Sequence, residues 1–370
     1  MIIVDAHEDI AYNMRQYGRD YTLSAAENRR REAGSATPQR SEDSLLGYSD
    51  YRRGRVAVIF STLFVSPLKA GVAEWEVEAY ANSQQAYQLY GAQIDTYQRL
   101  VEEHPDKFRL LQARPDLESI LGLWNNLPDT VDHEGSEIDL PVGLVISMEG
   151  AEGVRSVDEL EEWWQRGVRL IGPAWNGNRY TGGTREPGPL TKDGFALLEG
   201  MADLGFGLDL SHMDEKAALQ GLDVYPGTIL ASHANANALI KGVEGNRHLS
   251  DQVIRGLIER DGVIGVIPYN KFLDYTWRVE DGKGKITLQH VVAQIDYICQ
   301  LAGNALHVGL GTDFDGGFGW QSVPAEVDTI ADMQKLAPLL AEKGYSQADI
   351  TAILGANWLA LLRRVLPEAL

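Results

Sequence analysis

The chain has 370 residues, of which 33 are basic and 53 acidic, so its formal net charge is −20. This charge argues against nucleic acid or an anionic membrane as a partner. The single cysteine, Cys299, excludes an intramolecular disulfide and a cysteine-rich zinc site. The first residues, MIIVDAHEDIAYN, lack the basic region of a secretory signal, and no run reaches the roughly 18 apolar residues of a spanning helix. We therefore expect a cytoplasmic protein.

Short apolar runs alternate with helical patterns along the chain. Most of the runs are apolar without interruption, which is typical of strands buried on both faces of a parallel sheet. The predicted strands are Ile2–Ala6, Ala57–Phe64, Val142–Ser147, Val168–Gly172, Gly207–Leu210, Thr228–Ala231, Val263–Ile267 and Leu306–Gly311. The helical patterns include Trp75–Glu102, Ser156–Arg166, Asp193–Leu204, Asp251–Arg260, Leu288–Ala302 and a helix pair over Ser346–Val365 that breaks near Gly355.

Eight strands that alternate with helices predict an α/β fold, a single (β/α)8 TIM-type barrel that occupies residues 1–370. The competing architecture is a doubly wound open sheet. Such a sheet commonly carries a glycine-rich phosphate turn after its first strand, and this chain has DAHED there. The barrel is therefore the preferred prediction.

Three segments are additions to a minimal barrel of strands, helices and short loops. Met14–Arg55 is a long polar insertion after the first strand, and Gly177–Leu190 is a loop rich in glycine and proline after the fourth. Loops that follow strands lie on the catalytic face of a barrel, so both are candidates for a lid or a pocket wall. The first insertion could instead be disordered. Asn125–Asp139 is an acidic loop before the third strand.

Potential metal ligands stand at the ends of several predicted strands. His7 and Asp9 are two residues apart, so an extended backbone places both side chains on one face. Glu149 closes the third strand, and its carboxylate could bridge two ions. His212 and His233 each follow a serine, and they stand at the ends of the fifth and sixth predicted strands. Imidazole and carboxylate groups are zinc ligands, and this set is large enough for two divalent ions.

The last predicted strand leads into GTDFDG, which contains two aspartates. Asp313 is the candidate general base, placed to take a proton from a water that bridges the metals. Asp315 is its rival, because it would share the same face if the strand continued. The glycines Gly316 and Gly317 indicate that the chain has already turned, and this favours Asp313.

These motifs together resemble those of the membrane (renal-type) dipeptidases, peptidase family M19, in the amidohydrolase superfamily. The similarity runs through nearly the whole chain in order, in DAHED, SMEG, DLSH, SHANANAL, NRHLSD and GTDFDG. It implies a barrel that hydrolyses dipeptides, often with a D-residue at the C-terminal position, by means of a metal-bridging hydroxide. It also implies that His7 and Asp9 hold one Zn²⁺, that His212 and His233 hold another, and that Glu149 bridges them.

The resemblance assigns substrate-binding residues as well. Arg247 matches the arginine that binds the terminal carboxylate of the substrate, Asn178 matches a residue after the fourth strand, and Tyr269 is a further candidate. This chain departs from the family pattern at two positions. Trp175 occupies the place of a histidine that helps to bind the scissile carbonyl, unless it only packs there, and His248 replaces an asparagine.

The sequence therefore predicts a zinc-dependent metallo-dipeptidase with two Zn²⁺ ions, a catalytic Asp313 and a small peptide substrate. The alternatives are a related amidohydrolase that acts on another amide or a specialised peptide, and a catalytically silent binding protein on the same scaffold. Neither the number of subunits nor the identity of the metal follows from the sequence, and a homodimer stays open.

Overall fold

The computed structural model describes residues 1–69, 75–126 and 140–369. Eight parallel strands form a ring, and a bridge between Ala231 and Ile264 joins the two ends of the sheet. The ring strands, in spatial order, are β11 (Ile229–Leu230), β10 (Gly207–Asp209), β7 (Val168–Gly172), β6 (Val142–Glu149), β2 (Val56–Phe64), β1 (Ile3–Glu8), β13 (Val308–Leu310) and β12 (Ile264–Val266). The predicted (β/α)8 barrel is confirmed.

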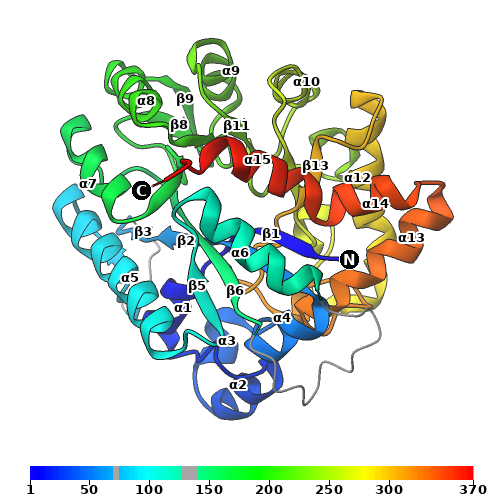
Figure 1. Cartoon of the computed structure of the whole chain (residues 1–370). Helices are drawn as coiled ribbons and strands as arrows, with labels where there is room; N and C mark the ends of the chain where they lie inside the picture. The colour runs from blue at the N-terminus through cyan, green and yellow to red at the C-terminus, as the bar shows by residue number, and fades with distance from the viewer. Residues whose placement is uncertain (70–74, 127–139, 370) are drawn as a thin grey trace.

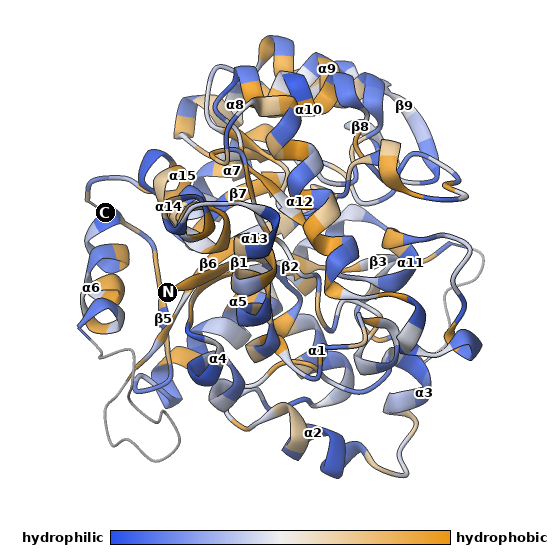
Figure 2. Cartoon of the chain, turned by 90° about the vertical axis from the view of Figure 1, so that its right-hand side faces the viewer, coloured by the Kyte–Doolittle hydropathy of each residue, from blue (hydrophilic) through white to orange (hydrophobic). Residues whose placement is uncertain are grey.

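Each of the eight predicted strands overlaps one strand of the ring. All nine residues of β2 and all eight of β6 are buried, as the unbroken apolar runs predicted. Figure 2 shows these central strands as mainly hydrophobic, with mixed hydropathy on the helices around them. A ninth strand of this sheet was missed: β5 (Phe108–Leu110) pairs with β6 outside the ring. With only three residues, it lacks a recognisable pattern.

Helices surround the barrel (Figure 1), and no helix in the described ranges is long and apolar enough to cross a membrane. The α-helices are α1 (Ile10–Tyr17), α2 (Ala25–Glu32), α3 (Thr37–Ser41), α4 (Tyr48–Gly54), α5 (Ser83–Glu103), α6 (Arg114–Asn125), α7 (Leu160–Gln165), α8 (Lys192–Leu204), α9 (Glu215–Val224), α10 (Asp251–Glu259), α11 (Asn270–Leu273), α12 (Leu288–Ala302), α13 (Leu336–Lys343), α14 (Gln347–Thr351) and α15 (Asn357–Val365). Two short pairs of strands lie outside the ring: β3 (Ser66–Pro67) with β4 (Ala79–Tyr80), and β8 (Thr181–Gly183) with β9 (Glu186–Leu190).

The insertion after the first strand is folded. It comprises the end of α1 and the helices α2 to α4, and it buries Tyr21, Leu45, Leu46 and Tyr51 completely. Its backbone is also tied to a distant part of the chain, because the Ile330 N–H donates to the carbonyl oxygen of Leu45. The disordered alternative for this segment is therefore wrong. The acidic loop Asn125–Asp139 lies outside the described residues, apart from its first two.

Two helix predictions need correction. The helix predicted to begin at Trp75 begins at Ser83, because the Asn82 side chain accepts a hydrogen bond from the Gln85 N–H at 3.0 Å and caps it there. The C-terminal helix pair is one helical stretch, in which a π-helical turn over Ala352–Ala356 joins α14 to α15. Gly355 packs against the backbone of Ile2, where a Cβ would lie 2.8 Å from the carbonyl oxygen. This glycine therefore permits a close approach and does not break the helix.

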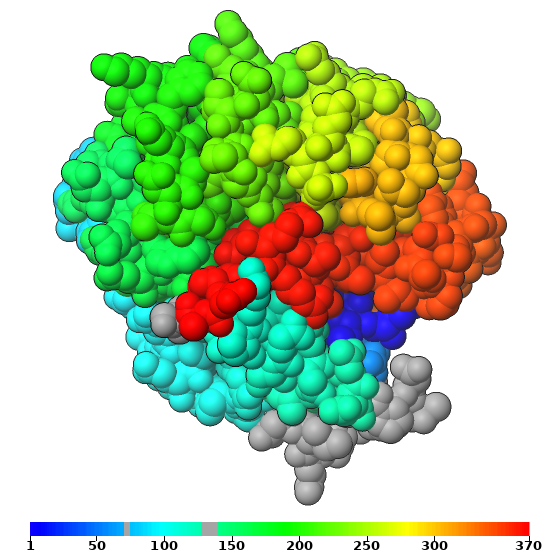
Figure 3. Space-filling view, turned by 45° about the horizontal axis from the view of Figure 1, so that its top comes forward, coloured from blue at the N-terminus to red at the C-terminus, as the bar shows by residue number. Residues whose placement is uncertain are grey.

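The C-terminal helix closes one end of the barrel. The indole N–H of Trp358 donates to the Leu310 carbonyl oxygen at 2.9 Å, and the Asn357 amide donates to the carbonyl oxygens of Ala305 and Val308. These acceptors lie along and just before β13. Figure 3 shows the C-terminal segment lying across the middle of this face. The opposite end, where the strands finish, remains for the functional site.

Candidate metal centre

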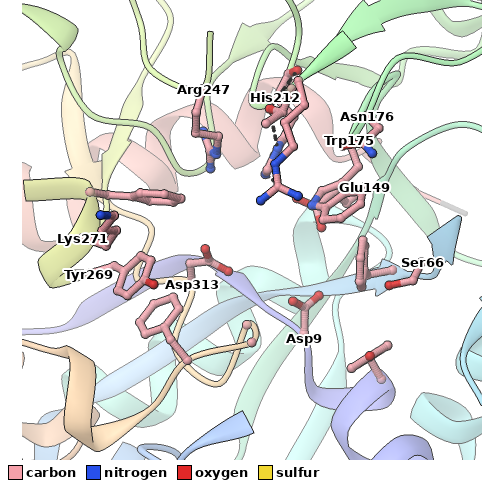
Figure 4. Close-up of a pocket in the computed structure, with 18 of the residues that line it drawn as sticks. Asp9, Ser66, Glu149, Trp175, Asn176, His212, Arg247, Tyr269, Lys271 and Asp313 are labelled. Carbon is pink, nitrogen blue, oxygen red and sulfur yellow. Dashed lines mark hydrogen bonds and ion pairs between the residues drawn. The ribbon is translucent and has the colours of Figure 1, made fainter. Parts of the chain in front are cut away.

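Six predicted site residues meet at the carboxyl ends of the barrel strands. β1 places His7 and continues to Asp9, β6 ends at Glu149, and short loops after β10, β11 and β13 carry His212, His233 and Asp313. Strand ends in a barrel converge on one face, so residues far apart in the sequence come together there. Figure 4 shows Asp9, Glu149, His212 and Asp313 directed toward a common space.

The carboxylate of Glu149 lies between two groups of potential ligands. Its Oε1 atom lies 2.9 Å from Nε2 of His212 and 3.3 Å from Nε2 of His233. Its Oε2 atom lies 3.8 Å from Nε2 of His7. One oxygen therefore faces the pair of histidines and the other faces the first strand, which is the arrangement required of a bridging carboxylate.

The second group of ligands surrounds His7. Its Nε2 atom lies 3.8 Å from Oδ1 of Asp9 and 3.9 Å from Oδ1 of Asp313. Two sets of side chains bring their ligand atoms within 4.8 Å of one another, namely His7 with Glu149 and His233, and His7 with Asp9 and Asp313. Each set offers the nitrogen and oxygen donors that divalent metals such as zinc take.

Within the described ranges of the chain, two buried atoms at this centre have no hydrogen-bond partner. They are Nε2 of His7 and Oδ1 of Asp9, both on nearly inaccessible side chains. An unpaired buried polar atom costs about 1–3 kcal/mol, so folded proteins seldom leave one unsatisfied. A divalent ion between His7 and Asp9 would satisfy both atoms, and the residues present therefore fit a metal.

Hydroxyl groups orient all three histidines through the other ring nitrogen. Thr62 Oγ lies 3.3 Å from Nδ1 of His7, Thr184 Oγ lies 3.0 Å from Nδ1 of His212, and Ser232 Oγ lies 2.8 Å from Nδ1 of His233. Each contact leaves Nε2 directed at the centre, as outer partners of metal-binding histidines commonly do. Sequence reasoning missed Thr62 and Thr184. A polar residue inside the apolar run of β2 was the available signal for Thr62.

Burial adjusts the protonation of these groups. Burial, assisted by the positive charge of Arg247, lowers the pKa of His7 to about 3. It also holds the pKa values of His212 and His233 well below the ordinary range. The imidazoles are therefore neutral, which is the form that binds metals. In the absence of a cation, burial and the neighbouring charge of Asp9 raise the pKa values of Glu149 and Asp313.

Left-handed backbone conformations are concentrated at this site. His212 has φ 66°, Asp313 has φ 58° and Asp315 has φ 62°. Such values are uncommon for residues other than glycine and persist where the surrounding structure enforces them. Here they turn the chain sharply after β10 and β13, so that the side chains of His212 and Asp313 face the centre.

The two aspartates after β13 lie in different environments. The Asp315 carboxylate is fully buried and accepts hydrogen bonds from the Tyr21 hydroxyl at 3.0 Å, the Ser44 hydroxyl at 2.7 Å and the Leu45 N–H at 2.8 Å. All of these donors belong to the insertion, so Asp315 anchors that segment to the barrel. Asp313, in contrast, lines the open cavity above the metal centre.

A cavity of about 670 Å³ lies over the centre. Among the predicted substrate residues, Arg247, Trp175 and Tyr269 line it. Asn178 does not: its amide donates to the Pro173 carbonyl oxygen and accepts from the N–H groups of Tyr180 and Thr181. Asn176 lines the cavity instead.

Aromatic side chains form a substantial part of the cavity wall. Tyr269 stacks on Phe318 with ring centroids 4.1 Å apart, and burial raises its pKa to about 12. Trp175 contacts Phe64 edge to face at 5.1 Å. Figure 4 places Arg247, Tyr269 and Lys271 on one side of the cavity, and Ser66, Trp175 and Asn176 on the other. A small organic molecule with an anionic group fits such a space better than an extended polymer does.

Comparisons with known proteins agree with these features. The family model described as membrane dipeptidase (peptidase family M19) matches residues 1–369. An uncharacterized protein in the pqqA 5′ region of Klebsiella pneumoniae is 34% identical over 244 residues, which cover 63% of this chain and 86% of that protein. The dipeptidase tcpJ of Claviceps purpurea is 26% identical over 339 residues, which cover 87% of this chain and 70% of the relative.

A solved structure shares the fold. It is a metallo peptidase from Rhodobacter sphaeroides liganded with a phosphinate mimic of the dipeptide L-Ala-D-Ala, and it superposes with a TM-score of 0.74 at 20% identity over 99% of both chains. The match of the family model to nearly every residue decides the assignment. The chain belongs to the membrane dipeptidase family, peptidase family M19, and is a hydrolase of the metallo-dipeptidase type.

Proposed function

We propose that this protein is a zinc-dependent dipeptidase with a dinuclear metal centre, and that it hydrolyses the amide bond of small dipeptides. The position of Glu149 is the observation that carries the proposal. Its two oxygens face two separate groups of histidine and aspartate side chains, 2.9 Å from His212 and 3.8 Å from His7. A single ion would leave one of these groups without a role.

The chemistry of the donors supports zinc. His7, Asp9 and Glu149 would hold one ion, and His212, His233 and Glu149 would hold the other. Neutral imidazole and carboxylate are common zinc ligands, and burial keeps these imidazoles neutral by lowering their pKa values. When bound, such ions lower the pKa of a coordinated water and polarise the carbonyl group of a substrate.

Asp313 is the residue we assign to proton transfer. It lines the cavity, lies 3.9 Å from the ligand atom of His7, and has no role in anchoring the insertion, unlike Asp315. Its carboxylate would accept a proton from the attacking water and then donate it to the leaving amine.

Arg247 is placed to hold the terminal carboxylate of a dipeptide. Its side chain is 5% exposed, and one Nη donates to the His233 carbonyl oxygen at 3.0 Å. Nε and the other Nη have no partner among the described residues. A buried guanidinium with donors to spare is suited to binding a carboxylate. The ligand of the Rhodobacter sphaeroides structure, a mimic of L-Ala-D-Ala, supports substrates of this size and a D-residue at the C-terminal position.

Trp175 favours a second candidate, a related hydrolase that acts on a specialised peptide or another amide. It stands where the family pattern has a histidine that binds the scissile carbonyl. Its ring lies 6.2 Å from the ring of His212, close enough to contact a substrate at the metal centre. An indole N–H can donate one hydrogen bond but cannot titrate. A substrate other than an ordinary dipeptide would explain this replacement.

A panel of L-X/L-Y and L-X/D-Y dipeptides tests the proposal with zinc-reconstituted protein. We expect turnover of at least one member, and we expect Asp313→Asn to reduce kcat by at least about 100-fold while it retains the metal. Asp158→Asn, at an exposed position away from the cavity, is the matched control. Full metal occupancy without turnover of any dipeptide would reject the dipeptidase and leave the second candidate.

A further inference from the structure

Away from the metal centre, the cavity lining has more basic than acidic residues, although the protein as a whole is acidic. Apart from the three acids beside the metal centre, the described cavity lining contains two acidic residues and four basic ones, namely Glu76, Glu244, Arg40, Arg185, Arg247 and Lys271. The whole chain has the opposite balance, with 53 acidic and 33 basic residues. A cleft of this kind attracts anions. One carboxylate, held by Arg247, would leave the other cations without a ligand.

Two of these cations contact the part of the cavity wall that holds Phe272 and Tyr275, and a third acts on Tyr275 electrostatically. The Lys271 ammonium lies 5.5 Å from the centre of the Tyr275 ring and donates to the Tyr275 carbonyl oxygen at 2.6 Å. The Arg247 guanidinium lies over the adjacent Phe272 ring at 5.3 Å. The charges of Arg247 and Arg185 both oppose the rise that burial and, to a smaller extent, the charge of Glu244 cause in the pKa of Tyr275. Arg185, Arg247 and Lys271 therefore act on one region of the cavity.

The backbone of Arg185 is held firmly beside the metal centre. It lies between β8 and β9 with φ 66°, and its N–H donates to Oδ1 of Asn246 at 3.0 Å. The Asn246 amide in turn donates to the Gly183 carbonyl oxygen, and the preceding Thr184 contacts Nδ1 of His212. Arg185 is thus fixed between a metal-ligand loop and the segment that carries Arg247.

The guanidinium of Arg185, in contrast, has no ion pair or hydrogen bond with any other part of the chain that the structure describes. Its neighbour Glu186 is already paired with Lys69 at 2.6 Å, and Glu244 makes no ion pair with Arg185 within 4.0 Å. Lys271 uses one of its three donors on a carbonyl oxygen. Both cations therefore have donors available for a ligand.

From this arrangement we infer that Arg185 and Lys271 form a second carboxylate-binding position beside Arg247. The substrate would then be a dipeptide whose C-terminal residue has an acidic side chain. Arg247 binds the terminal carboxylate, and Arg185 and Lys271 bind the carboxylate of the side chain. This inference rests on the proposed function, and it adds the substrate class that the site selects.

The test compares substrates that differ only in charge. We would measure kcat/KM of the zinc-reconstituted full chain for alanyl-glutamate and alanyl-glutamine, with both the L- and the D-form of the second residue. Because a hydrogen bond to a charged group contributes about 1.5–3 kcal/mol, we expect at least one glutamate epimer to be preferred by about tenfold or more. In Arg185→Gln and in Lys271→Gln, this preference should fall by about tenfold.

Arg40→Gln is the matched control, because Arg40 is a cation of the same cavity that lies over Trp75 at 4.5 Å. The preference for glutamate should persist in this variant. In Arg185→Lys it should be partly restored relative to Arg185→Gln. Equal rates for glutamate and glutamine substrates in the unmodified protein would overturn the inference. An equal loss of kcat/KM for both substrates in Arg185→Gln would also overturn it. So would a loss of the glutamate preference in Arg40→Gln alone.

A binding measurement separates this inference from the proposed function. Free glutamate and glutamine, which are product-sized probes, would be titrated calorimetrically into the zinc-loaded protein. Tighter binding of glutamate that weakens in Arg185→Gln supports the second carboxylate position even if no dipeptide is hydrolysed. Equal binding of the two probes counts against it, whether or not dipeptides are hydrolysed.

Discussion

The guanidinium of Arg19 lies 3.2 Å from the carboxylate of Asp315, and neither side chain is exposed to solvent. Arg19 belongs to the insertion after β1, and Asp315 follows β13, which pairs with β1 in the ring. Arg19 also forms an ion pair with Glu32 at 2.9 Å. The ion pair therefore joins the insertion to the loop that carries Asp313, two residues before Asp315.

We expect Asp315→Asn to lower the free energy of unfolding by about 3–5 kcal/mol, because it leaves a buried arginine charge with one partner fewer. Urea denaturation followed by circular dichroism would measure the change. Asp158→Asn removes an exposed carboxylate and should alter stability by less than about 0.5 kcal/mol. A loss below about 1 kcal/mol in Asp315→Asn would contradict the structural role assigned to this residue.

The barrel could be predicted from the sequence because its strands are apolar on both faces. An unbroken run such as that of β2 cannot form an exposed strand, and eight such runs separated by helical patterns allow few architectures. The start of the helix predicted over Trp75–Glu102 and the course of the C-terminal helix were harder to predict from the sequence. They depend on a side-chain cap at Asn82 and on a tertiary contact of Gly355, which local periodicity does not contain.

The candidate site was predictable only where its residues end apolar strands. His7, Glu149 and His233 stand out because a polar side chain at such a position needs a partner. Thr184 and Arg185 lie in a loop whose position over the barrel cannot be derived from residue spacing. Only the tertiary structure brings them close to His212. The family resemblance predicted Asn178 as a substrate residue, but its side chain bonds to its own loop. Asn176, two residues earlier, lines the cavity.

Glu149→Gln should reduce the metal content, because an amide oxygen is a poorer bridge than a carboxylate. We expect zinc to fall from about two ions per chain to one or fewer, and kcat to fall by at least about 100-fold. Metal analysis of the purified variant would measure the first effect. Glu152→Gln, three residues along the same segment, should keep both ions. Unchanged zinc in Glu149→Gln would contradict the bridging role.

Trp175→His tests whether the aromatic wall determines the substrate. If the indole excludes ordinary dipeptides, the imidazole should raise kcat/KM for L-Ala-D-Ala by about tenfold, by restoring a hydrogen bond to the scissile carbonyl. Steady-state kinetics of both proteins would measure this ratio. Trp175→Phe is the matched control, since it keeps the aromatic contact with Phe64 but has no donor. Equal rates for all three proteins would show that Trp175 only packs there.

Cys299 should react slowly with thiol reagents. Its side chain is 5% exposed, and burial raises its pKa to about 11, so little thiolate is present at pH 8. The thiolate is the reactive form, and we expect alkylation by iodoacetamide to be at least about tenfold slower than in guanidinium chloride. Mass spectrometry would follow the single modification. Alkylation as fast as that of a free thiol would contradict the buried position on α12.

Metal-free protein should show a pH dependence that comes from Asp9. Burial, together with the charge of Asp315, raises the pKa of Asp9 from 3.8 to about 7. An acid whose pKa is raised by folding stabilises the folded state fully only below its unfolded pKa, and it loses this contribution as the pH rises through the folded pKa. The contribution of Asp9 to the free energy of unfolding should therefore decrease between about pH 4 and pH 7.

The variant Asp9→Asn isolates this effect from the histidines, whose lowered pKa values act in the opposite direction. Relative to Asp9→Asn, metal-free wild-type protein should lose at least about 1 kcal/mol of stability between pH 5 and pH 7.5, measured by urea denaturation. Zinc should release protons when it binds below pH 7, because it displaces the proton of Asp9. Parallel pH profiles of the two proteins would refute the raised pKa.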